Sequence, residues 1–270
     1  MKPVSHSRWT LPDLPQALSW CERRNREGIR CTLHVLDEYV RTEQAAGSVA
    51  STYSQAIAGI DRQGLLASVS VKLSSLGILS DSDAAMERTV ELCREAARAG
   101  VGFEIDMEGK GLIGAAIEAA GLCRRDNYPV TLALQAYLNR TPGDVRILLA
   151  LGITPRFVKG AYHGDITDMN ETGERFLALV REVHHYGVPF HIGTHDPALI
   201  HEICTLMDTA RDRIEFGFLL GLADRTKQDM AAEGWQVSEY IPYGTEGAAY
   251  IARRERYIRE LAGSGREPAP

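Results

Sequence analysis

Residues 156–162 read RFVKGAY and place two cations, Arg156 and Lys159, beside small residues. The Phe-Val pair between them is typical of a buried strand, and Lys159 stands where that strand would end. Gly160 lets a ligand approach the backbone closely because it has no side chain. Parallel α/β folds bind ligands at the carboxyl ends of their strands, so these cations favour an anionic ligand. Strand ends also carry cations that only reach water, and the segment alone leaves that alternative open.

A second group with chemical potential lies near the C-terminus. Tyr250 precedes Arg253 and Arg254 by three and four residues, so the three side chains share one helix face. Neighbouring arginines point about 100° apart around a helix, but their long side chains let both reach one carboxylate. A solvated helix face is the ordinary alternative. Together with the cations at strand ends, the pattern favours a small ligand that is anionic and partly apolar.

The elements that must position these residues are short apolar runs alternating with amphipathic stretches. Near-continuous apolar character is typical of strands buried on both faces. Candidate strands cover residues 30–36, 67–73, 101–106, 129–136, 155–160, 188–194, 213–220 and 236–242. Eight strands, each followed by a helix at intervals of roughly 25–35 residues, predict a (β/α)8 barrel. A doubly wound open sheet is the alternative, but no GxGxxG follows the first strand.

The predicted organisation is a single α/β domain over residues 1–262. An extra N-terminal helix at about residues 12–27 is expected to cover the bottom of the barrel, and a C-terminal helix is expected over the active site. Residues 263–270 are rich in Gly and Pro and are expected to form a disordered tail. The N-terminus has no apolar leader and no run of 18 apolar residues occurs, which predicts a cytoplasmic protein. A peripheral encounter with the inner face of a membrane stays compatible with this expectation.

Composition narrows the partners further. The formal net charge is −6 and basic runs are brief, so the sequence does not favour nucleic acid as a partner. The five cysteines are scattered and form no CxxC, which indicates buried thiols in a reducing compartment rather than a disulfide framework or a zinc site.

In a barrel, functional side chains come from the strands' carboxyl ends. The predicted second to eighth strands place there a set of charged, amide and aromatic residues: Lys72, Asp106, Glu108, Gln135, Tyr137, Arg156, Lys159, Tyr162, Thr194, His195, Leu219, Tyr240 and Tyr243.

Six short motifs carry a family resemblance. They are SVKLS at 70–74, IDME at 105–108, LQAY at 134–137, RFVKGAY at 156–162, GTHD at 193–196 and YIARR at 250–254. Their order and placement resemble the FAD-dependent proline dehydrogenases, including the dehydrogenase domain of bifunctional proline utilisation enzymes. The resemblance runs from about residue 12 to 257.

The resemblance implies a distorted (β/α)8 barrel, similar to a TIM barrel, with FAD at its C-terminal face. The implied reaction is oxidation of L-proline to pyrroline-5-carboxylate by hydride transfer to FAD, and the electrons would pass to a quinone-type acceptor. The implied catalytic residues are Lys72, Asp106, Tyr240, Tyr250, Arg253 and Arg254. The implied substrate pocket adds Ala161, Tyr162 and Leu219. The implied cofactor contacts are Gln135, Arg156, Lys159, Gly160, Thr194 and His195, and no metal site is implied.

Three positions depart from the family pattern. Gly217 stands where the family usually has Gln, His163 where an aromatic or aliphatic residue is common, and Tyr257 where a Glu commonly follows the arginine pair. These changes bear on flavin affinity and on the choice of cyclic imino acid. Tyr240, in contrast, predicts a pocket sized for unsubstituted proline.

Two other functions stay compatible with the residues. A non-catalytic or flavin-free relative could bind a small cyclic amino acid, and Gly217 and Tyr257 favour this alternative. A divalent-metal hydrolase or lyase could use His191 and His195, four residues apart, with Asp106, Glu108 and His34 as further ligands. Lys72 and the arginine pair disfavour a metal site because they would repel a cation.

Overall fold

Eight parallel strands close into a barrel in chain order, and each strand pairs with its neighbours in sequence, with β8 returning to β1. The computed structural model describes residues 8–160 and 164–263, with side chains described as far as residue 259. The strands lie at the eight predicted positions, so the predicted barrel is confirmed. Their bounds are Arg30–Val35 (β1), Ala67–Val71 (β2), Gly102–Ile105 (β3), Thr131–Gln135 (β4), Thr154–Val158 (β5), Phe190–Gly193 (β6), Ile214–Leu219 (β7) and Gln236–Tyr243 (β8).

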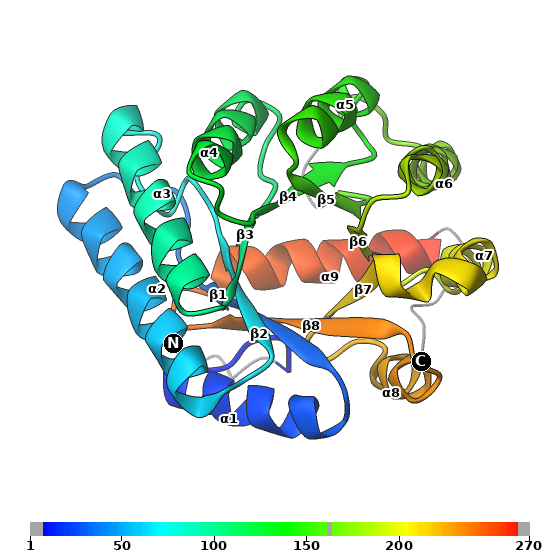
Figure 1. Cartoon of the computed structure of the whole chain (residues 1–270), viewed down its shortest axis with the longest axis horizontal. Helices are drawn as coiled ribbons and strands as arrows, with labels where there is room; N and C mark the ends of the chain where they lie inside the picture. The colour runs from blue at the N-terminus through cyan, green and yellow to red at the C-terminus, as the bar shows by residue number, and fades with distance from the viewer. Residues whose placement is uncertain (1–7, 161–163, 264–270) are drawn as a thin grey trace.

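Helices surround the barrel as an outer ring (Figure 1). They are α1 (Leu14–Arg26), α2 (Glu43–Gln63), α3 (Ser82–Arg98), α4 (Ile113–Arg125), α5 (Thr141–Leu151), α6 (Met169–Tyr186), α7 (Pro197–Met207) and α8 (Asp224–Ala232). A 3-10 helix at Asp208–Arg213 follows α7, and a final helix outside the ring is α9 (Ala248–Gly263).

Local sequence explains where several helices begin and end. The side chains of Asp81, Asp168 and Asp196 accept hydrogen bonds from the first turns of α3, α6 and α7. Gly187 ends α6 in the left-handed conformation, with φ at 71°, which costs a glycine little. These caps determine where the chain leaves each helix for the next strand.

The N-terminal helix α1 does not cover the bottom of the barrel, and this part of the prediction was wrong. Leu11, just before α1, bridges to Tyr243 at the carboxyl end of β8, so α1 runs down the outside of the barrel. Trp20 Nε1 donates to Glu239 in β8 over 2.6 Å, and Arg24 reaches Glu239 and Asp224 of α8. These side chains fix α1 in the outer ring beside β8, α8 and α2 (Figure 1). Apolar periodicity predicts the helix but not which neighbour its buried face will meet.

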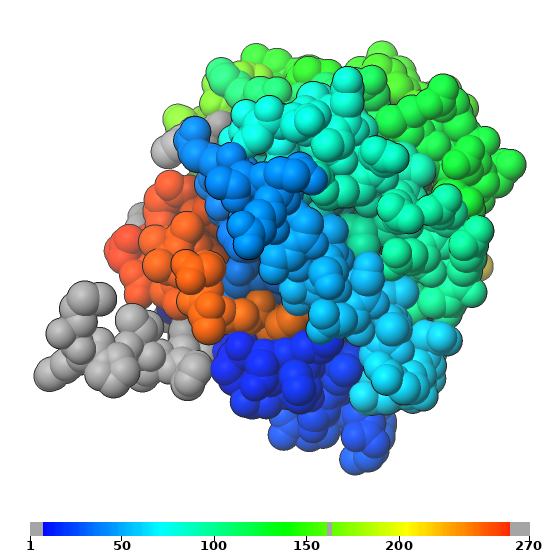
Figure 2. Space-filling view, turned by 90° about the vertical axis from the view of Figure 1, so that its left-hand side faces the viewer, coloured from blue at the N-terminus to red at the C-terminus, as the bar shows by residue number. Residues whose placement is uncertain are grey.

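The final helix, α9, takes a different course from the helices of the ring. It lies across the end of the barrel, behind the strands in Figure 1, and Figure 2 shows its orange to red surface at the left of the view. Its residues line the same cavity as residues from the carboxyl ends of the strands. The expected C-terminal helix over the barrel's functional end is therefore confirmed.

The inside of the barrel is more polar than its apolar strand sequences suggest. Thr32, Ser68 and Glu104 form a hydrogen-bonded group there, in which Ser68 Oγ lies 2.9 Å from Thr32 Oγ1 and 3.1 Å from Glu104 Oε1. In β5 and β6, buried and half-buried residues alternate, because one face of these strands packs against helices and the other borders open space. The barrel therefore holds a polar interior that a cavity can enter from one end.

Two further predictions bear on the chain as a whole. Within the part of the chain that the structure describes, no helix has the length and apolar character needed to cross a membrane. Residues 264–270 of the predicted tail lie outside the described residues.

Candidate active site

A cavity opens at the carboxyl ends of the strands, beneath α9. It encloses about 1080 Å³ of empty space, including the part open to solvent. Polar groups from β2, β3, β4 and β5 and from α9 converge on it, with apolar and glycine positions from β6 and β7 on the other side. The lining residues are Thr32, Lys72, Asp106, Met107, Gln135, Arg156, Val158, Lys159, Gly160, Gly193, His195, Gly217, Phe218, Leu219, Ser238, Tyr240, Tyr250, Arg253, Arg254 and Tyr257.

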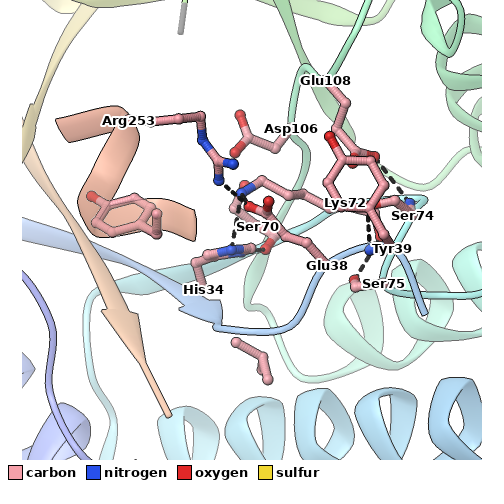
Figure 3. A network of polar contacts seen from close by, with 12 residues as sticks. His34, Glu38, Tyr39, Ser70, Lys72, Ser74, Ser75, Asp106, Glu108 and Arg253 are labelled. Atoms are coloured by element: carbon pink, nitrogen blue, oxygen red, sulfur yellow. Dashed lines mark hydrogen bonds and ion pairs between the residues drawn. The ribbon is translucent and has the colours of Figure 1, made fainter. Parts of the chain in front are cut away.

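Lys72 and Arg253 meet at one carboxylate (Figure 3). Lys72 Nζ lies 2.5 Å from Glu38 Oε1, and Arg253 Nη2 contacts the same oxygen. All three side chains are buried or nearly so. Burial favours the protonated acid, but Lys72 and Arg253 outweigh it and hold the pKa of Glu38 below its ordinary value. A strand-end lysine and a helix arginine thus converge on a single anion site.

Asp106 organises the neighbouring cations. Its Oδ1 accepts a hydrogen bond from Arg156 Nη2 over 3.0 Å, and its Oδ2 accepts one from the hydroxyl of Tyr240 over 2.9 Å. Arg156 also pairs with Glu104 through its other terminal nitrogen. Burial alone would raise the pKa of Asp106, but Arg156 and then Lys72 hold this pKa below its ordinary value. Asp106 is therefore a charged acceptor that fixes both Arg156 and Tyr240.

Arg254 has a different environment from Arg253. It is only 7% exposed, its guanidinium lies over the ring of Tyr250 with 4.9 Å to the centroid, and it donates to the Tyr250 hydroxyl. Its buried Nε has no hydrogen-bond partner, and among the described residues no carboxylate pairs with Arg254. A buried cation without a counter-charge is costly, on the order of several kcal/mol, so the site favours an incoming anion.

The far side of the cavity contains Lys159 and His195. Lys159 Nζ lies 2.9 Å from Asp196 Oδ2, and both side chains are buried. His195 Nε2 accepts the backbone N–H of Leu219 over 3.0 Å, so its other ring nitrogen carries the proton when the ring is neutral. Burial, followed by the charges of Arg254 and Lys227, holds the pKa of His195 well below its ordinary value. His195 therefore presents a neutral ring, which lies edge-on to Tyr257 with 6.0 Å between centroids.

Glycines shape the cavity floor. Gly193 and Gly217 are direct neighbours across β6 and β7, and both border the cavity. Gly160 has φ at 130°, and a Cβ there would stand 2.1 Å from the ring of Tyr137. Glycine is thus required at position 160 because of its packing against Tyr137 and its backbone conformation. The sequence did not reveal either of these reasons. The Gly193–Gly217 pair leaves a floor on which a flat ligand could lie.

The structure brings together most of the residues that the sequence proposed. Of the described residues that the family resemblance implied, only Thr194 does not line the cavity; its Oγ1 instead accepts the backbone N–H of Asp196 at the start of α7. Three further residues predicted at strand ends do not line it either: Glu108, Tyr137 and Tyr243. Gln135 donates to the backbone oxygen of Glu108 over 3.1 Å, and its Oε1 is buried without a partner. Ala161, Tyr162 and His163 lie outside the described residues.

Sequence reasoning missed three residues of the site. Glu38 pairs with Lys72 and Arg253, Glu104 pairs with Arg156, and His34 lies 3.2 Å from Lys72 Nζ. The sequence suggested His34 only as a metal ligand. Glu38 follows shortly after β1. The functional residues were sought at the carboxyl ends of the later strands, and the same search at the end of the first strand could have found Glu38. No local signal marks Glu104, because its partners lie on other strands.

The residues proposed for a metal do not assemble. His191, inside β6, faces Glu215 with 3.8 Å between Nδ1 and Oε1, whereas His195 lies past the strand's end and bonds Leu219. Glu108 Oε1 accepts the backbone N–H of Ser74 over 3.0 Å. Over residues 8–160 and 164–259, no group of three or more His, Cys, Asp or Glu side chains could hold a metal ion.

Comparison with known proteins agrees with this geometry. Residues 17–256 match the protein family described as proline dehydrogenase. The chain is 27% identical to proline dehydrogenase 1 of Bacillus subtilis over 248 residues, which cover 89% of this chain and 82% of that protein. It is also 27% identical to the proline dehydrogenase of Deinococcus radiodurans over 255 residues, again covering 89% and 82%.

Solved structures show the same fold. Proline utilization A of Bdellovibrio bacteriovorus, inactivated by N-propargylglycine, superposes with a TM-score of 0.80 at 18% identity and covers 91% of this chain. A Bradyrhizobium japonicum proline utilization A mutant gives a TM-score of 0.75 at 20% identity with the same coverage. This chain spans only 31% and 30% of those two proteins, so they support the fold alone. From the family match, which extends over most of its length, the chain belongs to the proline dehydrogenase family.

Proposed function

We propose that this proline dehydrogenase binds FAD and L-proline in the cavity beneath α9, forms pyrroline-5-carboxylate, and delivers electrons to a quinone-type acceptor. Proline dehydrogenase activity, an oxidoreductase reaction, follows from the family to which the chain belongs, and that family is flavin-dependent. The observation that carries the assignment of the site is Arg254, a buried cation with no carboxylate partner among the described residues. It stands beside two other cations at a cavity lined with aromatic rings.

The substrate carboxylate would bind among the three cations that line the cavity, Lys72, Arg253 and Arg254. Arg253 and Lys72 already hold one carboxylate, that of Glu38, and so have the spacing that such a group requires. Arg254 adds a third donor from the same helix face. Charge-assisted hydrogen bonds of this kind are about twice as strong as neutral ones. These three residues therefore bind and orient the substrate through its charge.

The pyrrolidine ring would lie against apolar surface beside this anion site. Tyr240, Tyr250 and Leu36 form a buried cluster, and Leu219 packs against it. Asp106 holds the hydroxyl of Tyr240, which fixes the ring plane of that side chain. The tyrosines and Leu219 would therefore position the ring carbon that reacts and exclude water from it.

The residues across the cavity fit a flavin. Gly193 and Gly217 leave a flat floor, the buried Oε1 of Gln135 lacks a donor, and Arg156 and Lys159 supply positive charge. We assign the cofactor contacts to Gln135, Arg156, Lys159, Gly160 and His195, with Thr194 supporting the turn behind them. When bound, FAD would accept the hydride that leaves the ring carbon next to nitrogen. One proton must leave the ammonium of the substrate, because the lone pair that this frees forms the C=N bond of the product as the hydride departs.

Purification of the chain tests this assignment directly. We expect a yellow protein whose flavin absorption is lost on addition of L-proline under anaerobic conditions and returns with a soluble quinone. A colourless protein that takes up no added FAD would contradict the proposal. That result would favour a flavin-free relative, the alternative that Gly217 and Tyr257 support.

A further inference from the structure

His34 is a fully buried histidine in β1 that touches two of the proposed catalytic residues. Its Nε2 lies 3.2 Å from Lys72 Nζ, and its ring stacks on Tyr240 with 5.4 Å between centroids and 30° between planes. Its side chain is 0% exposed. Figure 3 shows the ring beneath the point where Lys72, Glu38 and Arg253 meet.

The surroundings of His34 fix which nitrogen carries the proton. Its Nδ1 lies 3.1 Å from the backbone oxygen of Ser70, and this oxygen can only accept a hydrogen bond. The hydroxyl of Tyr53 donates to the same oxygen over 2.7 Å, so Ser70 holds both side chains in place. Nδ1 therefore carries the hydrogen, and Nε2 presents a lone pair to the ammonium of Lys72.

The charged groups around His34 leave it neutral. Lys72, directly after β2, is in contact with it. Asp106, directly after β3, and Glu38, after β1, lie nearby, and Tyr53 of α2 and Tyr240 of β8 enclose the ring. Burial first, and Lys72 second, lower the pKa of His34 to about 3, against weaker opposing effects of the two carboxylates. The ring can accept from Lys72 throughout the neutral pH range without adding any charge.

We propose that His34 is a positioning residue for the substrate carboxylate site: its neutral lone pair orients the ammonium of Lys72 while its ring supports Tyr240. The inference rests on the proposed function because it assumes that Lys72 binds the substrate. Lys72 has one charged partner, Glu38, and one neutral partner, His34. A carboxylate partner weakens the attraction of Lys72 for a second anion, whereas an imidazole lone pair holds the ammonium and leaves its charge available.

Three substitutions at His34 separate this role from a merely structural one. His34→Gln keeps an acceptor near the position of Nε2, His34→Leu removes it, and His34→Asp replaces it with a charge. We expect the KM for proline to stay within about threefold in His34→Gln. We expect a rise of about tenfold or more in His34→Leu and in His34→Asp, with smaller effects on kcat, because one charge-assisted contact is lost or neutralised.

A matched control removes apolar volume from the same strand. Leu33 is also fully buried but belongs to the hydrophobic core rather than to the cavity. Leu33→Ala should lower the unfolding midpoint without changing the KM for proline. If His34→Leu does not fold, the comparison of the Gln and Asp variants tests the proposal instead: an equal KM for proline in both would overturn it. The pH dependence of kcat adds an independent readout. If one ionisation seen in the wild-type profile is missing in His34→Gln, His34 acts as an acid or base in the reaction instead.

Binding of cyclopentanecarboxylate, measured by calorimetry, separates this proposal from the proposed function. This probe has the carboxylate and the apolar ring but no amine to oxidise. A wild-type protein that binds it but does not oxidise proline contradicts only the proposed function. If the wild type and a folded His34→Leu bind cyclopentanecarboxylate with equal affinity, only the role of His34 is contradicted. If the wild type binds neither cyclopentanecarboxylate nor proline, both the proposed function and the role of His34 are contradicted.

Discussion

Glu38 places its Oε1 2.5 Å from the ammonium of Lys72, and Arg253 contacts the same oxygen. A carboxylate of the chain thus engages two of the three cations proposed to hold the substrate carboxylate. Glu38→Gln removes this competing charge while keeping the shape, so we expect the KM for proline to fall about three- to tenfold. Steady-state kinetics with Glu38→Asp as the charged control checks this. A raised KM in Glu38→Gln alone would show that Glu38 assists binding.

Arg254 should contribute more to substrate binding than any other residue of α9. Arg254→Met removes an unpaired buried cation, and each charge-assisted hydrogen bond contributes about 1.5–3 kcal/mol, so the KM should rise roughly ten- to a hundredfold. The fold should survive, because no described carboxylate depends on Arg254. Arg259→Met, at an exposed position of the same helix, is the matched control. Equal KM values in both variants would remove Arg254 from the site.

Sequence reasoning located the strands because an apolar run is a property of neighbouring residues. The apolar runs predicted all eight strands. The carboxyl ends of the strands then had to meet at one end of the barrel. Lys72, Asp106 and Tyr240 come together for that reason alone.

The pairing of charges could not be predicted in the same way. Arg156 is a cation in any reading of the sequence, but its partner Glu104 is far away in sequence and meets it inside the closed barrel. The course of α1 is a second example, because it depends on the burial of Arg24 against Glu239 on the last strand. Contacts of this kind depend on register and closure, which a single sequence does not encode locally.

Cofactor retention tests the far side of the cavity. Lys159 and Asp196 form a buried pair, so Lys159→Gln should be combined with Asp196→Asn to avoid leaving a buried carboxylate without its neighbouring ammonium. We expect the double variant to fold but to purify with much less FAD per chain than the wild type, measured by absorbance. The single variant Asp196→Asn, which keeps the cation, controls for changes in the turn. A full complement of flavin in the double variant would place the cofactor elsewhere.

The stability of the fold should depend on the protonation of His34. Its pKa is 6.5 in an unfolded chain and about 3 in the folded one, so between these values the unfolded state binds more protons. The contribution of His34 to stability is therefore fully present above pH 6.5 and is lost as the pH falls toward 3. Within this window, the free energy of unfolding should fall by up to about 1.4 kcal/mol for each pH unit of acidification.

His34→Gln cannot take up this proton and should lose less stability on acidification than the wild type. Urea unfolding at pH 7.5 and pH 5 measures the difference between the two proteins. His195 is also held neutral by burial and contributes to both proteins in the same direction, so it does not affect the comparison. The same loss of stability in both proteins would mean that folding does not lower the pKa of His34.

Tyr240 should determine which ring the pocket accepts. Its hydroxyl is held by Asp106 over 2.9 Å, one side of its ring stacks on His34, and Arg156 lies 5.7 Å from the ring centroid. A side chain with contacts on so many sides cannot move aside for a larger substrate without breaking them. An extra hydroxyl on the substrate must displace it or be buried without a partner, at a cost of about 1–3 kcal/mol.

We therefore expect the wild type to prefer proline over trans-4-hydroxy-L-proline by roughly ten- to a hundredfold in kcat/KM. Tyr240→Ser should narrow this ratio, mainly because proline binding weakens when the ring wall is lost. Tyr240→Phe keeps the ring but frees Asp106, and it should retain the preference while changing the contacts of Arg156. Equal kcat/KM values for the two substrates in a flavin-loaded wild type would show that the space beside Tyr240 is large enough for the hydroxyl.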